Sequence, residues 1–558
     1  MRYLLYAISL LFILSSCEKE VKPNVKLDLP NRPNILWLVA EDLSPYIPSF
    51  GDSTIQTPNL SRLAAEGVCY DNFYSPSPVC APSRAAIAMG MYPTKIAANH
   101  MRTGPWFAPD VPQAIMDRMK PYWPEGIPLY DAMPPEGSRM MSEYLRMAGY
   151  YCSNNAKEDY QFRRTLTSWD ESSDKAHWSN RKAGQPFFAV FNFGVTHESQ
   201  IWGKATDSLW VDENLDVPVP PYLPDTEIGQ KDVRRMYSNI KEMDYQVGEI
   251  LKQLEEDGEL DNTIIVWYTD HGGPLPRQKR LLYDSGLKVP MIIRYPNQQL
   301  AGTRNDDLIS FIDLAPTTLS IANIEPPKEM DGKAFLGKYE RKEKAKYIYA
   351  AADRFDAVYD RNRAVRDKQF KYIRYYNPEK PMFLQVAYRE QMAIMQELHR
   401  LKKEGKLTKA QALWFRETKP KEELFDTKND PHEINNLADD PKYADKLKEL
   451  RHQCEQWVNS FEDTGMMDEK DLIAKLWPNG QQPKVKEPII ENKDGIITIS
   501  SPTKGALIGY QFINTENPVD SWSIYTEPFE VNGADSLKVV ADRIGYLRSE
   551  TVELRIEN

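Results

Sequence analysis

Cysteine is scarce in this chain of 558 residues. The five cysteines are Cys17, Cys69, Cys80, Cys152 and Cys454, and their spacing shows no paired pattern. A disulfide framework of the kind that holds small secreted domains together is therefore excluded. A chain of this length can instead bury large apolar cores, and its length predicts about two to four domains.

The sequence also lacks a long apolar run near its start. The run over residues 4–14 is shorter than the roughly 20 residues that a membrane-spanning helix needs. It follows the basic Arg2 and precedes small residues, which is typical of an export signal. Residues 14–17, LSSC, resemble a bacterial lipobox, which implies cleavage before Cys17 and lipidation of that cysteine. The alternative is a plain secreted protein in which Cys17 is incidental.

We therefore expect a signal peptide over residues 1–16 and a lipidated polar tether over residues 17–30. The expected location is that of an exported outer-membrane lipoprotein, in the periplasm or at the cell surface, with the lipid as its contact with the membrane.

Positive charge is in deficit, with 70 lysines and arginines against 81 aspartates and glutamates and a net charge of -11. This balance argues against a nucleic acid as partner. If the substrate is an anion, positive charge has to be concentrated locally at the site.

One cysteine lies in an unusual segment. Residues 78–84 are PVCAPSR, so that prolines lie on both sides of Cys80, and a helical pattern begins immediately after it. Prolines disfavour a helix in the preceding residues, so the pattern predicts Cys80 at or just before a helix N-terminus. Backbone N–H groups and the helix dipole favour an anion at such a place.

This segment resembles the signature of the type I, formylglycine-dependent sulfatases, Cys-x-Pro-Ser-Arg followed by a helix and then Gly-x-x-Pro. The matching residues are Cys80, Pro82, Ser83, Arg84, Gly90 and Pro93. In that family a formylglycine-generating enzyme oxidises the cysteine of the unfolded segment to formylglycine (3-oxoalanine). The resemblance implies that residue 80 works as an aldehyde, whose hydrate attacks sulfur with one oxygen and later expels sulfate with the other.

Three apolar segments predict strands that are buried on both faces of a parallel sheet, over residues 33–40, 186–193 and 261–269. Each segment ends in polar residues, and the carboxyl ends of strands are where open α/β sheets bind ligands.

The sulfatase resemblance assigns a divalent metal to several of these strand-end residues. The ligands that it implies are Glu41, Asp42, Asp270, His271 and residue 80 itself. Sulfatases carry an Asp-Asp pair where this chain has Glu41 and Asp42, so the longer Glu41 is a departure from the pattern. Hard oxygen ligands favour Ca²⁺ over zinc.

The resemblance also implies cationic partners for sulfate. Lys157 and Lys279 are expected to bind the sulfate group, while Arg84 and the metal orient the hydrated formylglycine.

Three residues are candidates for moving protons or facing the substrate. His197 follows the strand over 186–193, as a histidine does in the family, and is the candidate acid for the leaving group. Asp159 stands where sulfatases often have a histidine, and either Asp159 or another base takes up that role. His100 faces the substrate or is a structural histidine.

The alternation of strands and helices over residues 31–345 predicts a doubly wound α/β catalytic domain, which the resemblance implies to be alkaline phosphatase-like with a mixed sheet. Residues 346–480 are expected to form a smaller α+β subdomain with a helical insertion over 382–416. Short strands and turns over 485–558 predict a small β-sandwich-like module, with a structural cap as the expected role.

The predicted function is therefore that of a sulfuric ester hydrolase acting on a sulfated carbohydrate. Candidate substrates are the algal polymers ulvan, carrageenan and fucoidan, or glycosaminoglycans. Two alternatives stay open: a phosphoester hydrolase of the same superfamily, and a surface protein that binds sulfated glycans without catalysis.

Overall fold

The computed structural model describes residues 27–104, 117, 120–513, 521–530 and 536–556. The predicted signal peptide and the predicted lipidation site at Cys17 lie outside the described residues. Among the helices of the described residues, none combines the length and the apolar character that crossing a membrane requires.

The molecule is organised around a nine-stranded mixed sheet in the order β4-β3-β5-β1-β6-β7-β2-β8, with β9 paired to β2. Its strands are β1 (Asn34–Ala40), β2 (Val68–Tyr74), β3 (Tyr151–Asn155), β4 (Glu171–Ser172), β5 (Phe187–Phe193), β6 (Thr263–Thr269), β7 (Lys288–Arg294), β8 (Thr303–Asn305) and β9 (Ile309–Ser310). The strands β3, β5, β1 and β6 run parallel, whereas β7 is antiparallel to both β6 and β2.

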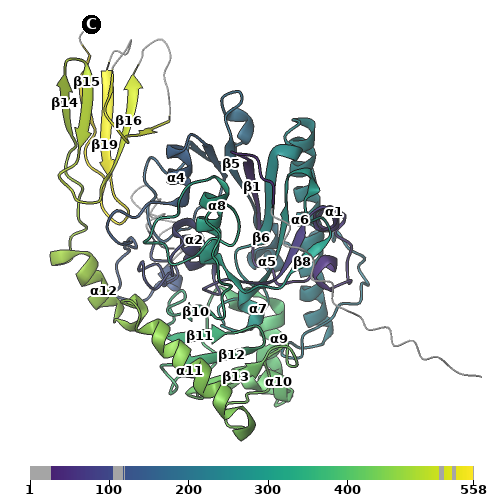
Figure 1. The fold of residues 1–558 in the computed structure, drawn as a ribbon. Helices are drawn as coiled ribbons and strands as arrows, with labels where there is room; N and C mark the ends of the chain where they lie inside the picture. Colours follow the sequence, from purple (N-terminus) through teal and green to yellow (C-terminus); the bar gives the residue numbers. More distant parts are fainter. Residues whose placement is uncertain (1–26, 105–116, 118–119, 514–520, 531–535, 557–558) are drawn as a thin grey trace, which may run out of the picture.

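The helices around this sheet are α1 (Pro58–Glu66), α2 (Cys80–Met89), α4 (Met141–Met147), α5 (Ser199–Gly203), α6 (Glu227–Glu256), α7 (Asp284–Leu287) and α8 (Leu314–Ile321). Successive residues of a strand point to opposite faces, so both faces of the apolar β1 need a cover. Leu36 and Leu38 pack in one core with residues of α1 and α6, while Ile35 and Trp37 pack in a second core with residues of α2, α4 and α8. Figure 1 shows these two helical layers on opposite sides of the sheet. This arrangement confirms the predicted doubly wound α/β fold.

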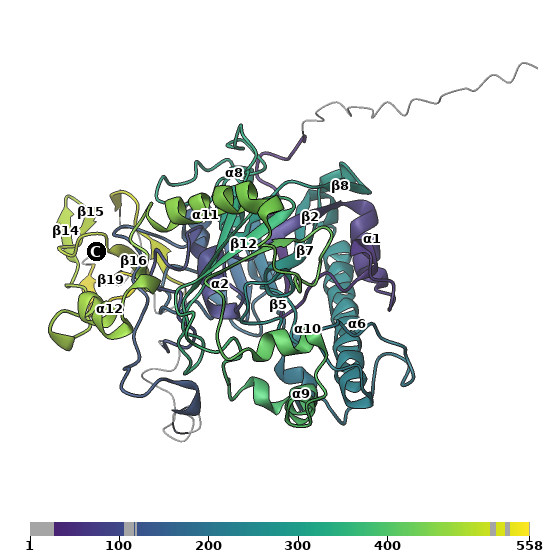
Figure 2. The same ribbon diagram turned by 90° about the horizontal axis from the view of Figure 1, so that it is seen from below.

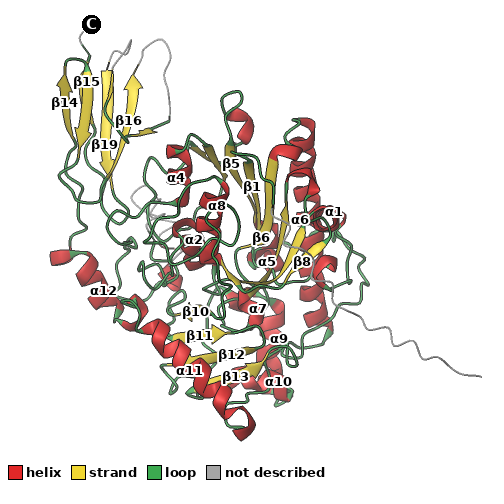
Figure 3. Ribbon diagram, in the orientation of Figure 1, coloured by secondary structure: helices red, strands yellow, loops and turns green. Residues whose placement is uncertain are grey.

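A second, antiparallel sheet follows the nine-stranded sheet in the chain. It consists of β10 (Ile348–Ala352), β11 (Asn362–Arg366), β12 (Phe370–Tyr375) and β13 (Glu422–Asp426), and α11 (Ala444–Val458) lies along it (Figure 3). The chain between β12 and β13 carries α9 (Ala393–Lys403) and α10 (Lys409–Ala412), and α12 (Glu469–Leu476) follows α11. We call the segment from 382 to 416 the inserted segment; Figure 2 shows its two helices beside α6.

The C-terminal residues form two small facing sheets. One contains β14 (Ile489–Lys493), β15 (Ile496–Ser500) and β18 (Phe529–Glu530); the other contains β16 (Leu507–Ile513), β17 (Ser523–Ile524), β19 (Ser536–Asp542) and β20 (Val552–Arg555). Apolar residues of both sheets share one core. The sandwich contacts the catalytic domain through the Arg146 Nη2 bond to the Trp522 carbonyl, 2.7 Å, and the Leu166 N–H bond to Asp542, 3.1 Å.

The inserted segment is fixed to α6 by one buried carboxylate. Oδ2 of Asp232, on α6, accepts a hydrogen bond of 2.7 Å from the backbone N–H of Ile394, at the start of α9. Ile394, Met395 and Leu398 are buried in the core that α6 also lines. Burial raises the pKa of Asp232 to about 6, although the Ile394 N–H opposes this shift.

The raised pKa of Asp232 makes the stability of this anchor depend on pH. In the unfolded chain the carboxyl pKa is about 4, so folding favours the protonated form, and the free energy of unfolding falls by up to about 3 kcal/mol as pH rises from 4 to 6. Asp232→Asn keeps an oxygen acceptor for Ile394 without ionising. We expect it to raise the unfolding temperature relative to the wild type at pH 7.5 but not at pH 4, measured by scanning calorimetry.

The exposed Asp225, just before α6, supplies the matched control: Asp225→Asn should leave the unfolding temperature close to that of the wild type at both pH values. A difference between Asp232→Asn and the wild type that is the same at pH 4 and pH 7.5 would contradict the assigned titration.

Candidate active site

The polar residues after three parallel strands meet at one edge of the central sheet. Glu41 and Asp42 follow β1, His197 follows β5 and the 3₁₀ helix η5 (Gly194–Thr196), and Asp270 and His271 follow β6. They come together because parallel strands end at the same edge.

Two overlapping groups at this edge have the composition of a metal site. The ligand atoms of Glu41, Asp42 and His197 lie within 4.8 Å of one another, and so do those of Asp42, Asp270 and His271. Four of these five side chains are buried.

His271 provides the test of whether a cation fits. Its Nδ1 lies 2.9 Å from the Gly272 carbonyl, which accepts only, so Nδ1 donates and Nε2 of the neutral ring carries a lone pair. That Nε2 is buried without a hydrogen-bond partner in the described part of the chain, 3.0 Å from Asp42 Oδ1 and 3.7 Å from Asp270 Oδ1. A lone pair facing two carboxylates is favourable when a cation lies between them. The residues present therefore fit a divalent metal.

Positive side chains surround the same carboxylates. Lys279 Nζ lies 2.8 and 3.0 Å from the two oxygens of Asp42, and Lys157 Nζ lies 2.9 Å from Glu41. Burial by itself would raise the pKa of Asp42, but the positive charge of Lys279 holds it well below its usual value. An acidic chain thus concentrates positive charge at this edge of the sheet.

Cys80 is the first residue of α2, and its side chain is buried beside these charges. The preceding Val79 is extended, which is the usual backbone conformation of the residue that caps a helix N-terminus. Burial raises the pKa of the Cys80 thiol to about 12, and the neighbouring Asp159 adds to this effect. The unmodified side chain is therefore a protonated thiol, which is a poor nucleophile.

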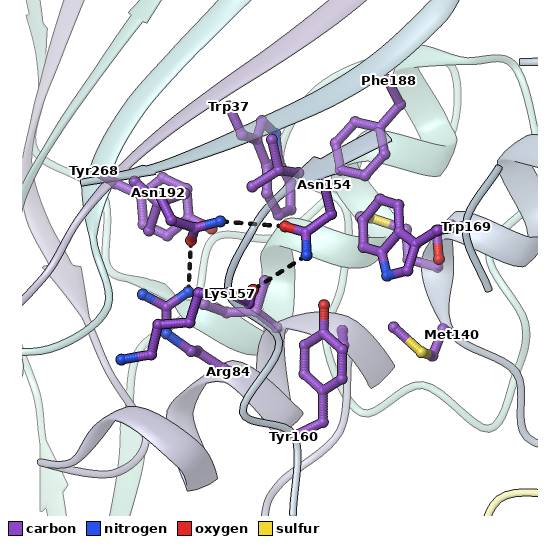
Figure 4. Close-up of a pocket in the computed structure, with 16 residues that line it drawn as sticks. Trp37, Arg84, Met140, Asn154, Lys157, Tyr160, Trp169, Phe188, Asn192 and Tyr268 are labelled. Carbon is purple, nitrogen blue, oxygen red and sulfur yellow. Dashed lines mark hydrogen bonds between the residues drawn. The ribbon is translucent and has the colours of Figure 1, made fainter. Parts of the chain in front are cut away.

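Arg84, one turn along α2, is held by two neighbours. Its Nε donates to Asp270 Oδ2 at 3.0 Å, and its Nη1 donates to Asn192 Oδ1 at 2.7 Å. Asn192, on β5, in turn donates to the Asn154 side chain at 3.1 Å (Figure 4) and to the Asn155 carbonyl at 3.0 Å. Asn192 was not among the predicted site residues, although a lone amide near the end of an otherwise apolar strand is a signal that could have found it.

Glu198 is a second residue that the sequence did not single out. Its carboxylate accepts bonds of 2.7 and 2.8 Å from Arg280 and lies 3.1 Å from Lys279. Its backbone N–H donates to Asp42 Oδ2 at 2.7 Å. Glu198 thus fixes both a carboxylate and an amine of the cluster.

The remaining two predicted residues lie in different surroundings. Asp159 lies beside the cluster, with Oδ2 4.0 Å from Lys157 Nζ. His100 is buried elsewhere: its Nδ1 accepts from the Arg354 N–H at 3.3 Å, and burial lowers its pKa to about 4. None of these described contacts joins His100 to the cluster, and they are of the kind that a structural histidine makes; its contact with substrate stays a prediction.

A cavity of about 40 Å³ lies behind the cations. Arg84, Lys157 and Asn192 line one part of it, and the rest is lined largely by apolar and aromatic side chains (Figure 4), among them Trp37, Tyr160, Trp169, Phe188 and Tyr268. An apolar wall lowers the local dielectric constant, which strengthens the attraction between these cations and an anion in front of them.

The chain is similar to known proteins over most of its length. A family model described as sulfatase matches residues 33–324, and one described as N-sulphoglucosamine sulphohydrolase, C-terminal, matches residues 277–409. A relative named ulvan-active sulfatase, from Formosa agariphila, is 48% identical over 596 aligned residues, which cover 99% of this chain and 97% of that protein.

Two solved structures share the fold. One, of a protein in complex with its substrate D-glucosamine-2-N,6-O-disulfate, has a TM-score of 0.55 at 18% identity and covers 78% of this chain and 100% of that chain. The other, a 2-O GAG sulfatase, has a TM-score of 0.54 at 21% identity and covers 80% of this chain and 94% of that chain.

Proposed function

The chain belongs to the sulfatase family and is a sulfuric ester hydrolase, and we propose that it removes sulfate from ulvan or from oligosaccharides of ulvan. The observation that carries this choice is the 48% identity to the ulvan-active sulfatase over 99% of the chain, which includes the inserted segment and the terminal sandwich. The similarity is not confined to the central sheet, which supports a shared substrate.

Ca²⁺ and a formylglycine at position 80 are the proposed cofactors. Glu41, Asp42 and Asp270 would offer hard oxygens to Ca²⁺, with His271 beside them. In the formylglycine, the aldehyde oxygen would replace the Sγ of Cys80. When both are present, they supply a hydrated aldehyde as nucleophile and a positive charge that polarises the sulfate group.

The side chains around residue 80 have separate roles in this proposal. Lys157 and Lys279 bind the sulfate oxygens, and Arg84, held by Asp270 and Asn192, orients residue 80. Asp159 accepts the proton that residue 80 releases; it takes the place of the histidine that many sulfatases use.

His197 gives its proton to the leaving sugar oxygen. Its Nε2 faces the Lys279 ammonium, which only donates, so Nε2 accepts from it in this arrangement and carries a proton only in the imidazolium form. Nε2 lies 3.3 Å from Lys279 Nζ and 4.0 Å from Glu41, on the side where sulfate would bind. A sugar hydroxyl is a poor leaving group, so this protonation is worth about 10²–10⁴-fold in rate.

The burial of Cys80 bears on its modification. The side chain is 3% exposed at the start of α2, so a formylglycine-generating enzyme would have to act before the chain folds. Export by a signal peptide and anchoring through a lipid on Cys17, at the outer membrane, complete the proposal; both rest on residues 1–17 of the sequence.

Sulfate release from defined polymers tests the substrate. Protein purified from cells that make the modifying enzyme should release sulfate from ulvan oligosaccharides faster than from carrageenan, fucoidan or chondroitin sulfate oligosaccharides, measured by ion chromatography. Cys80→Ala should lower this release by at least about 10³-fold while leaving the unfolding temperature close to the wild type.

The control is Cys454→Ala, which also removes a buried thiol but in α11. It should keep sulfate release. Preference for another polymer would overturn the choice of ulvan, and release that persists in Cys80→Ala would overturn the nucleophile.

Ca²⁺ binding can be followed without catalysis. Adding Ca²⁺ to chelator-treated protein should raise the unfolding temperature, because a ligand of the folded state stabilises it by mass action. Asp270→Asn should remove most of this shift. Asp261→Asn, at the opposite end of β6 and 76% exposed, is the control and should keep it. An equal Ca²⁺-dependent shift in Asp270→Asn and in Asp261→Asn would sink the assigned metal site.

A further inference from the structure

Beside His197 lies a group of large side chains that the proposed chemistry does not use. We call it the aromatic cluster: Tyr122, Trp202 and Tyr388, with Arg102. The ring of Tyr388 is centred 6.1 Å from that of His197, 5.0 Å from that of Trp202 and 5.7 Å from that of Tyr122. The three aromatic side chains are half-buried, so each exposes part of its surface next to the site.

The members of the aromatic cluster come from distant parts of the chain. Trp202 is in α5, just after His197, whereas Tyr122 ends the 3₁₀ helix η3 (Lys120–Tyr122). Tyr388 belongs to the inserted segment, immediately before the 3₁₀ helix η9 (Arg389–Gln391). Three separate segments thus meet at the side of the site where His197 lies.

Arg102 adds a positive charge between two of the rings. Its guanidinium carbon lies 5.5 Å from the ring centre of Tyr122 and 5.2 Å from that of Tyr388. Its Nε donates to Asp356, the one acceptor that its side chain contacts among the described residues. The Nη groups therefore keep the fork of N–H donors that matches a carboxylate or a sulfate.

The cluster is held in place before any ligand arrives. Asp356 also lies 3.4 Å from Arg280, whose other partner is Glu198 of the catalytic cluster. The residue after Tyr388, Arg389, is buried, and its guanidinium carbon lies 4.7 Å from the ring centre of Trp414. Side chains fixed in this way lose little conformational entropy on binding.

His197 relates the cluster to the sulfate. Its Nε2 faces Lys279, and its ring contacts that of Tyr388, so His197 contacts both a proposed sulfate-binding lysine and the aromatic cluster. In the proposed function His197 contacts the oxygen that joins sulfate to sugar. The sugar of the scissile ester then lies at His197, and the adjoining sugar of the chain lies at the aromatic cluster.

We propose that Tyr388, Trp202, Tyr122 and Arg102 form a binding subsite for the sugar next to the one that loses sulfate. The aromatic rings pack against the C–H face of that sugar, and Arg102 pairs with an anionic group on it, either a carboxylate or a second sulfate. The subsite rests on the proposed function, because it requires a carbohydrate substrate longer than one sugar.

The experiment compares two kinds of ligand in binding and in turnover. The first kind is a sulfated disaccharide in three forms: its neighbouring ring carries a carboxylate, the reduced form of that carboxylate, or a second sulfate in its place. The second is 4-nitrophenyl sulfate, which has no neighbouring ring. Calorimetry on the Cys80→Ala protein gives affinities without turnover, so the subsite is tested even if the protein does not hydrolyse these sugars.

Tyr388→Ala should weaken disaccharide binding about tenfold and should affect kcat/KM for 4-nitrophenyl sulfate much less. Tyr388→Phe should restore the affinity, because the ring remains. Arg102→Gln should weaken binding of the anionic disaccharides about tenfold and that of the carboxyl-reduced form less than twofold. The disaccharide form whose affinity falls more in Arg102→Gln, the carboxylate or the second-sulfate form, identifies the anionic group that Arg102 binds.

Tyr376→Ala is the matched control, since Tyr376 is a 36% exposed tyrosine after β12 and outside the cluster. It should keep the wild-type affinities. Equal losses for the disaccharide and 4-nitrophenyl sulfate in Tyr388→Ala, or unchanged disaccharide binding in both Tyr388→Ala and Arg102→Gln, would overturn the subsite. A different result would overturn the proposed function instead. In that case the wild type would release sulfate from none of the esters, while Tyr388→Ala and Arg102→Gln would still weaken disaccharide binding as expected.

Discussion

The balance of buried charge around Asp42 is the constraint on which the rest of the site depends. Its carboxylate is fully buried, and Lys279 and the Glu198 N–H both contact it. A buried carboxylate without such partners would be protonated rather than charged. The strand ends of β1, β5 and β6 have to deliver these partners together, and the parallel order of the sheet makes this possible.

Beyond the sheet, ion pairs connect this site to the aromatic cluster. Glu198 connects the catalytic cations to Arg280, and Arg280 connects through Asp356 to Arg102 in the aromatic cluster. The inserted segment adds Tyr388 at this point. The proposed chemistry is thus connected to the proposed sugar subsite, whose residues come from segments that are far apart in the sequence.

The sequence predicts much of this, and the reasons are local. Apolar runs predict β1, β5 and β6, and the segment around Cys80 predicts the start of α2, since each depends on neighbouring residues. Asn192 and Glu198 were missed because their roles arise from contacts with Arg84 and Asp42, distant in sequence. The contact of His100 Nδ1 with the Arg354 N–H likewise joins residues far apart in the sequence and could not be predicted from it.

The state of residue 80 tests the central claim most directly. Peptide mass spectrometry of the segment around position 80, on preparations with and without the modifying enzyme, gives the fraction of formylglycine, and sulfate release from ulvan oligosaccharides is measured on the same samples. We predict that the rate is proportional to the formylglycine fraction and vanishes when residue 80 is entirely cysteine. Full activity in protein whose residue 80 is an unmodified thiol would contradict the account.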